Sequence, residues 1–424
     1  MSALPPQATA PQDRPAGPST TARTDLGRPE PGGAVVDVVI ACHNPARPVG
    51  RAVASVLEGN PQACVTVVCH NRRAEEIAQV IDPVHRGRVR YLEHRDPRPS
   101  ASGPFNAGIR AARTPWVSIM GSDDSLAPGA VASWLRLARA TGAEFIVPRL
   151  ALGTPRTIVP TPAARPTRLL GPTLAGLGPR RSAVPRPLVL RLALIGRGLS
   201  TASLVADRLS YRSAPLGLMS VAMLAREDLW LVEGATVGGD VAMVTRMFAT
   251  VPTAYDARGP VYLIGEDASD RVTYVVRPIA EQLGFLDELL DQDWARALDL
   301  RSRRAVAAKM ARIHLFGAVH YRPDASTWTP QERADLAACA AHLEAFAPGY
   351  ATVLSVAETA LLRACLDPQV PASELISRSA ARRRHGRPST LLTGSPLTIL
   401  SREAPLRLMG ASVLTKMVPA DSRS

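Results

Sequence analysis

The amino-acid sequence predicts an α/β protein whose N-terminal half is a doubly wound, largely parallel sheet. Apolar runs rich in β-branched residues alternate with segments of helical periodicity, which is the pattern of such sheets. The first run, residues 35–40, is nearly continuous, as expected for a strand buried on both faces. Polar turns follow the early runs, and sheets of this kind bind ligands outside the carboxyl ends of their strands. The loops at 41–44, 69–73 and 121–125 therefore mark the predicted binding edge.

The predicted elements follow in regular order. Strands are expected at residues 35–40, 65–68, 89–92, 116–120 and 143–147, and helices at 49–57, 74–81, 105–112 and 128–140. Residues 150–215 are rich in Pro and Arg, and we interpret them as an insertion that packs over the sheet. Order is expected to return at 220–230, followed by a helix at 240–249 and a strand at 260–264.

The remaining segments divide into a disordered tail at 1–34, the sheet domain at 35–275, a helical domain at 276–370 and a basic, flexible tail at 371–424. The helical domain is predicted from local apolar spacing alone, and the basic tail from the arginine cluster at 382–387. A chain of 424 residues is long enough for several domains with full cores.

Charge and cysteine content restrict the class of protein. The net charge of +13 comes almost entirely from arginine, because Lys309 and Lys416 are the only lysines, and it favours an anionic partner such as a nucleotide or a membrane surface. No basic stripe interleaved with aromatic residues is present, which argues against nucleic acid. Five cysteines without a CxxC pair indicate a reducing compartment. With no secretory signal and no apolar run of about 20 residues, we expect a cytoplasmic protein, at most peripheral to a membrane.

Two adjacent carboxylates, Asp123 and Asp124, lie at the tip of the strand predicted at 116–120. Two adjacent like charges repel each other and so do not favour folding by themselves. Hard cations, however, take oxygen ligands and often share them with phosphates. The alternative is structural: Asp124 or Ser125 caps the following helix, and Asp123 is a solvated turn residue.

The order of several motifs resembles that of family 2 glycosyltransferases of the GT-A fold. The motifs are Val38–Asn44, Val67–Asn71, Asn106–Ile109, Gly121–Asp124, Glu233–Asp240, Pro260–Tyr262 and Ser269–Thr273. The resemblance spans about residues 35–273, with an atypical middle, and indicates a bacterial enzyme that builds cell-envelope glycans. It also implies that the insertion at 150–215 lies on the acceptor side.

The resemblance implies a role for each matching residue. Asp124 would hold Mn²⁺ or Mg²⁺ at the donor diphosphate, and Asp240 would be the general base that deprotonates the acceptor hydroxyl. Donor binding would fall to Ala41, His43, Asn44, His70, Asn106 and Asp123. A cation beside a leaving diphosphate and a carboxylate at the attacking hydroxyl meet the needs of inverting transfer.

Asp240 also has a structural interpretation. It follows two glycines and precedes an apolar helical segment, so it is equally suited to cap that helix or to favour its dipole. The same acid can perform both roles.

The chain departs from the family pattern at several positions. His70 occupies the position of an acid that contacts the base, and His43 that of a common aromatic; each is also an ordinary turn residue. Asn71 alternatively supplies left-handed turn geometry. Phe105 precedes Asn106 where the family usually has arginine, so another arginine would have to take over the phosphate contact.

The predicted function is therefore inverting, metal-dependent transfer of a sugar from a nucleotide-diphosphate donor, with a UDP-sugar favoured. The acceptor is expected to be a hydroxyl of a cell-envelope glycan, a lipid-linked sugar or a polyol-phosphate chain. One alternative is a sugar nucleotidyltransferase, although the loop after the first strand lacks the glycines of that class. A non-catalytic glycan-binding or scaffold protein with the same fold is the other alternative.

Overall fold

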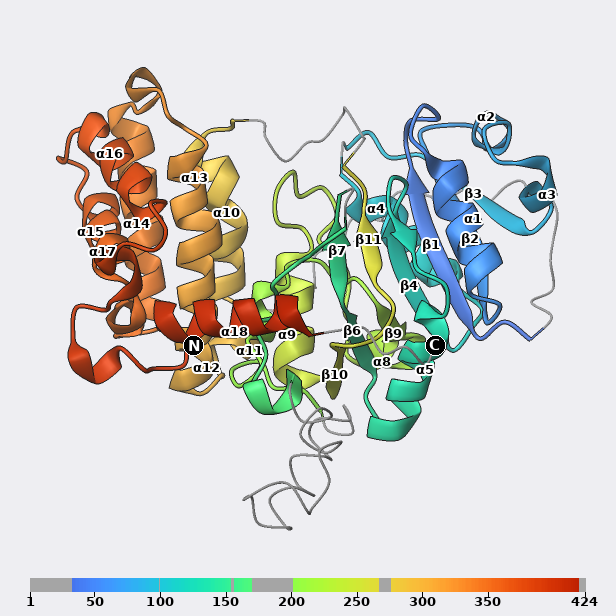
Figure 1. Cartoon of the computed structure of the whole chain (residues 1–424). Coiled ribbons are helices and arrows are strands. Elements are labelled where there is room, and N and C mark those ends of the chain that lie inside the picture. Colours follow the sequence, from blue (N-terminus) through green and yellow to red (C-terminus); the bar gives the residue numbers. More distant parts are fainter. Residues whose placement is uncertain (1–32, 99, 154–155, 170–200, 267–275, 419–424) are drawn as a thin grey trace, which may run out of the picture.

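The computed structural model describes residues 33–98, 100–153, 156–169, 201–266 and 276–418. The predicted disordered tail at 1–34 and the motif at 269–273 therefore lie almost wholly outside the described residues. Figure 1 shows two neighbouring parts, a sheet flanked by helices and a group of helices beside it.

The main sheet has seven strands in the order β10-β6-β9-β4-β1-β2-β3. All but β9 run parallel, and β9 is antiparallel to both of its neighbours. A smaller sheet has the order β5-β11-β7-β8. The strands are β1 (Val36–Cys42), β2 (Ala63–His70), β3 (Val89–His94), β4 (Trp116–Gly121), β5 (Ser125–Leu126), β6 (Phe145–Pro148), β7 (Leu150–Leu152), β8 (Thr157–Ile158), β9 (Leu218–Ser220), β10 (Thr253–Asp256) and β11 (Tyr262–Ile264).

Helices cover both faces of the main sheet, which confirms the predicted doubly wound α/β fold. Alternate residues of β1 enter different cores: Val38 and Ile40 cluster with α1 and α5, whereas Val39 clusters with α4 and α9. The helices of this half are α1 (Val49–Gly59), α2 (Ala74–Ala78), α3 (Pro83–Arg86), α4 (Ser102–Ala111), α5 (Ala130–Thr141), α8 (Val221–Arg226) and α9 (Val241–Thr250).

The C-terminal half is helical, as predicted, but its core is continuous with one face of the sheet. Val244 of α9 belongs to the same apolar cluster as Leu286 and Leu336. The helices are α10 (Ile279–Leu290), α11 (Asp293–Arg296), α12 (Leu300–Met310), α13 (Phe316–His320), α14 (Pro330–Phe346), α15 (Val356–Leu366), α16 (Ala372–Arg382), α17 (Pro388–Leu391) and α18 (Pro405–Met417), with a π-helical turn at Ala311–Leu315 joining α12 to α13.

The segment after residue 371 differs from the flexible tail predicted for it. Leu375 of α16 is fully buried, and Arg382 donates a hydrogen bond of 3.0 Å to the carbonyl of Arg312. α18 runs across the front of the molecule from the helices toward the sheet (Figure 1), and Arg149 donates a hydrogen bond to the carbonyl of Val418 just beyond it. The arginine-rich composition concealed enough apolar spacing to fold these helices against the rest of the chain.

Candidate active site

Asp124 is held by three protein donors at the carboxyl edge of the sheet. The Tyr262 hydroxyl donates to Oδ2 at 2.6 Å, the Gly121 amide to the same oxygen at 3.2 Å, and the Gly265 amide to Oδ1 at 2.9 Å. Tyr262 and Gly265 come from β11 and the residue just after it, so the smaller sheet fixes the carboxylate that follows β4. This arrangement excludes a simple helix cap as the role of Asp124.

Gly121 and Gly265 allow the backbone to approach the Asp123–Asp124 turn closely. A Cβ on Gly265 would lie 1.9 Å from the carbonyl oxygen of Asp123, and a Cβ on Gly121 would lie 2.7 Å from Oδ2 of Asp124. Any larger residue at Gly265 would therefore push β11 away from the Asp123–Asp124 turn, because the obstructing atom belongs to the backbone.

Burial raises the pKa of the Asp124 carboxyl, while the hydrogen bonds from Tyr262 and Gly265 oppose that rise. The neighbouring charge of Asp123 acts in the same direction as burial. An acid in this environment gains from a cation, because a positive charge offsets the desolvation of the carboxylate.

Asp123 borders a cavity of about 650 Å³ at the same edge. Its carboxylate lies 3.5 Å from the Arg47 guanidinium, and its carbonyl accepts a hydrogen bond of 2.6 Å from Arg51. Arg51 and Arg156 also line the cavity, together with Ser125 and Glu266. The cavity thus combines two acids with two cations, a mixture suited to a ligand with both hydroxyl and phosphate groups.

His70 and Asn71 follow β2 at the same edge. His70 is buried beside His94, with ring centroids 5.9 Å apart, and burial followed by the His94 ring lowers its pKa. Among the described residues, its Nε2 atom is enclosed without a hydrogen-bond partner. Asn71 has φ 56° and exchanges hydrogen bonds with the backbone of Asp96, so it supplies the left-handed turn that the alternative interpretation predicts.

The loop after β1 lies beside this turn. Ala41 pairs with Val68 of β2 and with Gly121 of β4, which brings the ends of all three strands to one edge. His43 is exposed and its carbonyl accepts a hydrogen bond from Arg72, while the side chain of Asn44 accepts one of 3.0 Å from the Ala46 amide. The Asn44 side chain therefore shapes its own turn.

Asn106 is fully buried in α4. Its amide nitrogen donates to the Leu231 carbonyl at 2.9 Å and to Glu233 at 3.0 Å, and its oxygen accepts from the Leu231 amide at 3.1 Å. Arg110, one turn later, pairs with the same glutamate at 3.0 Å. This side chain fastens the loop that leads to Asp240.

Asp240 occupies the N-cap position of α9, but its side chain forms no capping hydrogen bond. Burial raises the pKa of its carboxyl to about 6, and the charge of Lys309 opposes that rise. Asp240 is not among the residues that line the Asp123 cavity. The loop before it lies against the start of α4 at Gly239, where a Cβ would lie 2.6 Å from the Ser102 hydroxyl.

Sequence reasoning missed the groups behind Asp240. Lys309 is fully buried at the end of α12, its pKa is lowered to about 8 by burial, and its Nζ lies 2.9 Å from Nε2 of His314 in the π-helical turn. The His314 ring meets Phe285 edge-on at 4.9 Å, and Phe285 leaves no room for a Cβ on Gly238. A lysine inside an apolar helical stretch was the available signal, because the chain has only two lysines.

Tyr262 and the arginines around Asp123 were also missed. Tyr262 was assigned to a strand, but no spacing rule links it to an acid 138 residues earlier in the chain.

Among the described residues, no group of three or more His, Cys, Asp or Glu side chains converges as a metal site. No described helix combines the length and apolar character needed to cross a bilayer.

Part of the chain is similar in sequence to a known family. Residues 37–173 match the sequence model of glycosyl transferase family 2. The succinoglycan biosynthesis protein ExoO of Rhizobium meliloti (strain 1021) is 30% identical over 115 residues, which is 27% of this chain. That match spans only about a third, 33%, of the length of ExoO.

Solved structures support the fold. Residues 1–349 of S. aureus TarS in complex with UDP-GlcNAc superpose with a TM-score of 0.59 at 11% identity, covering 83% of this chain and 93% of that one. The crystal structure of S. aureus TarS gives a TM-score of 0.53 at 12% identity, covering 81% of this chain and 55% of that one. The match over residues 37–173 agrees with the predicted family for that segment, and the solved structures support the predicted GT-A-like fold.

Proposed function

We propose that this protein is an inverting, metal-dependent glycosyltransferase that moves a sugar from a nucleotide-diphosphate donor to a hydroxyl of a glycan acceptor. The observation that carries the proposal is the anchoring of Asp124 by Tyr262 and Gly265 beside the cavity that Asp123 lines. A carboxylate fixed at the carboxyl edge of a parallel sheet is well placed for a nucleotide ligand.

The donor would occupy the Asp123 cavity. Its volume of about 650 Å³ lies within the range of small-molecule sites. Asp123 would accept hydrogen bonds from ribose hydroxyls, and Arg51 and Arg156 would neutralise phosphate charge, replacing the arginine absent at Phe105. A UDP-sugar is favoured because TarS, which shares the fold, was crystallised with UDP-GlcNAc and with UDP.

Asp124 would hold a divalent cation through Oδ1, which accepts one hydrogen bond whereas Oδ2 accepts two. Mg²⁺ and Mn²⁺ suit this position, since such ions often bind one or two carboxylates together with substrate phosphates. When bound, the cation would stabilise the charge that develops on the leaving diphosphate. Substrate phosphates and water would complete the coordination of that cation.

Asp240 would act as the general base. A carboxyl with a pKa of about 6 is ionised at neutral pH yet basic enough to take a proton from a hydroxyl as it attacks. Asn106 would support it indirectly, by fastening the Leu231–Glu233 segment that leads into the Asp240 loop. We therefore propose a positioning role for Asn106 and keep His43, Asn44 and His70 as donor-side residues.

We further propose that the acceptor is a cell-envelope glycan, a lipid-linked sugar or a polyol-phosphate chain. The relatedness to a succinoglycan biosynthesis protein supports a polysaccharide product. The net charge of +13 would suit an anionic polymer or a cytoplasmic membrane surface. A cytoplasmic location with peripheral membrane association completes the proposal.

A panel of nucleotide-sugars tested by thermal shift with Mn²⁺ examines the donor assignment, because a bound ligand raises apparent stability by mass action. We expect a UDP-sugar to raise the melting temperature in a metal-dependent way. Slow hydrolysis of that donor by the wild type, lost in Asp124→Asn, would separate an enzyme from a non-catalytic glycan-binding protein. Binding of no nucleotide under any metal condition would contradict the proposal.

A further inference from the structure

A second cavity, of about 720 Å³, shares no lining residue with the Asp123 cavity. Val205 and Ala206 form one wall, and the nearby Ala202 bridges to Thr253, the first residue of β10. Because β10 runs parallel to β6 and so in the same direction as β4, its first residue marks the amino edge. The other walls come from α12 and from the segment that leads into α18.

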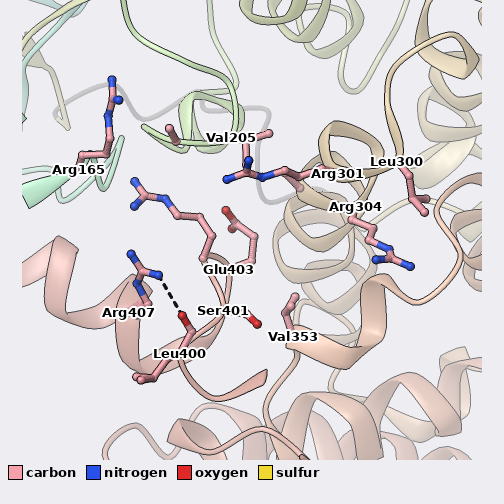
Figure 2. Close-up of a pocket in the computed structure, with 13 residues that line it drawn as sticks. Arg165, Val205, Leu300, Arg301, Arg304, Val353, Leu400, Ser401, Glu403 and Arg407 are labelled. Atoms are coloured by element: carbon pink, nitrogen blue, oxygen red, sulfur yellow. Dashed lines mark hydrogen bonds between the residues drawn. The ribbon is translucent and has the colours of Figure 1, made fainter. Parts of the chain in front are cut away.

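Arginines dominate the lining of this cavity, with five of them against one glutamate. Figure 2 shows Arg301 and Arg407 extending toward a common space from different walls, whereas Arg304 turns outward and Arg165 turns away. Arg165 forms an ion pair with Asp207 at 2.9 Å. In the described part of the chain, neither Arg301 nor Arg407 lies within 4.0 Å of a carboxylate, although Arg407 donates a hydrogen bond of 3.0 Å to the Leu400 carbonyl, drawn in Figure 2.

Arg402, on the same wall, is the least satisfied cation. Its Nε and Nη2 atoms are enclosed without a hydrogen-bond partner among the described residues. Burial, together with the charge of Arg208, lowers its pKa to about 10. Enclosed guanidinium donors are costly to leave unpaired, so a site that keeps them is suited to an external acceptor.

The one acid in the lining has its own cation. Oε1 of Glu403 lies 3.8 Å from Nε of Arg208, and Arg208 also donates hydrogen bonds to the Arg402 carbonyl at 2.5 and 3.2 Å. This network ties the insertion to the C-terminal segment and fixes the wall that carries Arg402. Both carboxylate oxygens of Glu403 are also enclosed without a hydrogen-bond partner among the described residues, and one carboxylate against five lining arginines leaves the positive charge of the cavity in excess.

We propose that the cavity lined by Arg301, Arg402 and Arg407 binds a phosphate group. Three guanidinium groups on different walls match a tetrahedral dianion, which offers three or more oxygens, better than a carboxylate, which offers two. The phosphate could belong to a soluble compound or to a phospholipid headgroup. The proposal is independent of the donor site, because no residue lines both cavities.

The test compares two double variants with the same change in net charge. Arg301→Gln/Arg407→Gln removes two exposed cations of the cavity, and Arg136→Gln/Arg139→Gln removes two exposed arginines of α5, outside it. Pyrophosphate is titrated calorimetrically into each protein in EDTA, so that a metal-dependent donor site contributes nothing. We expect the cavity variant to bind pyrophosphate at least about tenfold more weakly than the wild type and the α5 variant, and acetate at equal ionic strength to bind to none of them.

Vesicles distinguish the two sources of phosphate. Cosedimentation of the wild type with phosphatidylglycerol vesicles but not with phosphatidylcholine, lost only in the cavity variant, would assign a lipid headgroup. Binding of pyrophosphate without vesicle capture would assign a soluble compound. Equal weakening in both double variants, or binding of neither probe, would overturn the proposal. UDP binding with Mn²⁺ should be unchanged in the cavity variant, so that failure here is separable from failure of the donor site.

Discussion

The phenol of Tyr262 donates a hydrogen bond of 2.6 Å to Oδ2 of Asp124, from a strand that lies 138 residues further along the chain. The bond connects the two sheets of the domain at the point where the main sheet exposes its carboxyl edge. The carboxylate that accepts this hydrogen bond is buried, and the proposed donor site depends on it.

Tyr262→Phe should weaken donor binding and change its pH dependence. Loss of a hydrogen bond to a charged group removes about 1.5–3 kcal/mol, equivalent to at least about tenfold in affinity. Because Tyr262 lowers the pKa of Asp124, its removal raises that pKa and moves the onset of UDP binding with Mn²⁺ to higher pH. Calorimetry across a pH series measures both effects. Tyr91→Phe, on β3, is the control, and identical pH curves for the two variants would contradict the assigned role.

Asp240→Asn should abolish sugar transfer while leaving donor binding near that of the wild type. In the wild type, the rate should increase about tenfold per pH unit below a pKa of about 6 and level off above it, because only the ionised carboxylate accepts the proton. Transfer assays over roughly pH 4.5–8 measure the profile. Loss of donor binding together with transfer would assign Asp240 to the structure of the loop instead.

Lys309→Met should shift the acidic limb of that profile upward. The Lys309 charge lowers the pKa of Asp240, so removing it makes the carboxyl harder to ionise and moves the half-maximal rate to higher pH. Lys416→Met is a matched control, since it removes the other lysine of the chain from an exposed position. A parallel loss of rate at every pH, without a shift, would show that Lys309 acts only through folding.

Asn106→Ala should destabilise the fold more than it weakens donor binding. The substitution leaves the carbonyl and amide of Leu231 without their partners, which costs about 1–3 kcal/mol for each buried polar group left unpaired. Urea unfolding measures the free energy of unfolding, and UDP calorimetry on the folded variant measures binding. Unchanged stability together with lost UDP affinity would instead indicate that Asn106 contacts the donor directly.

Much of the fold was predictable from the sequence because the strand runs are short, β-branched and bounded by turns. The β1 strand and the Asp123–Asp124 turn came directly from that pattern. Local periodicity could not reveal α18, which packs at the end of an arginine-rich segment, or the continuous core between α9 and α10.

The candidate site was predictable only where its residues are neighbours in sequence. Asp123 and Asp124 could be predicted because they are adjacent acids, and the left-handed turn at Asn71 could be predicted from its residue type. The Tyr262 bond to Asp124 and the Lys309 charge near Asp240 depend on packing between distant elements, which sequence spacing does not encode. The burial of Asn106 likewise follows from tertiary structure.

The most direct test is calorimetric titration of UDP into the wild type and Asp124→Asn, each with Mn²⁺ and with EDTA. Glu266→Gln serves as the control, since it changes an exposed acid that lines the same cavity, and melting temperatures establish that each variant is folded. If Asp124 anchors a cation and the donor diphosphate, the wild type and Glu266→Gln bind UDP with Mn²⁺, EDTA abolishes binding, and Asp124→Asn binds at least about tenfold more weakly. Equal UDP affinity in folded Asp124→Asn and the wild type would contradict that anchor.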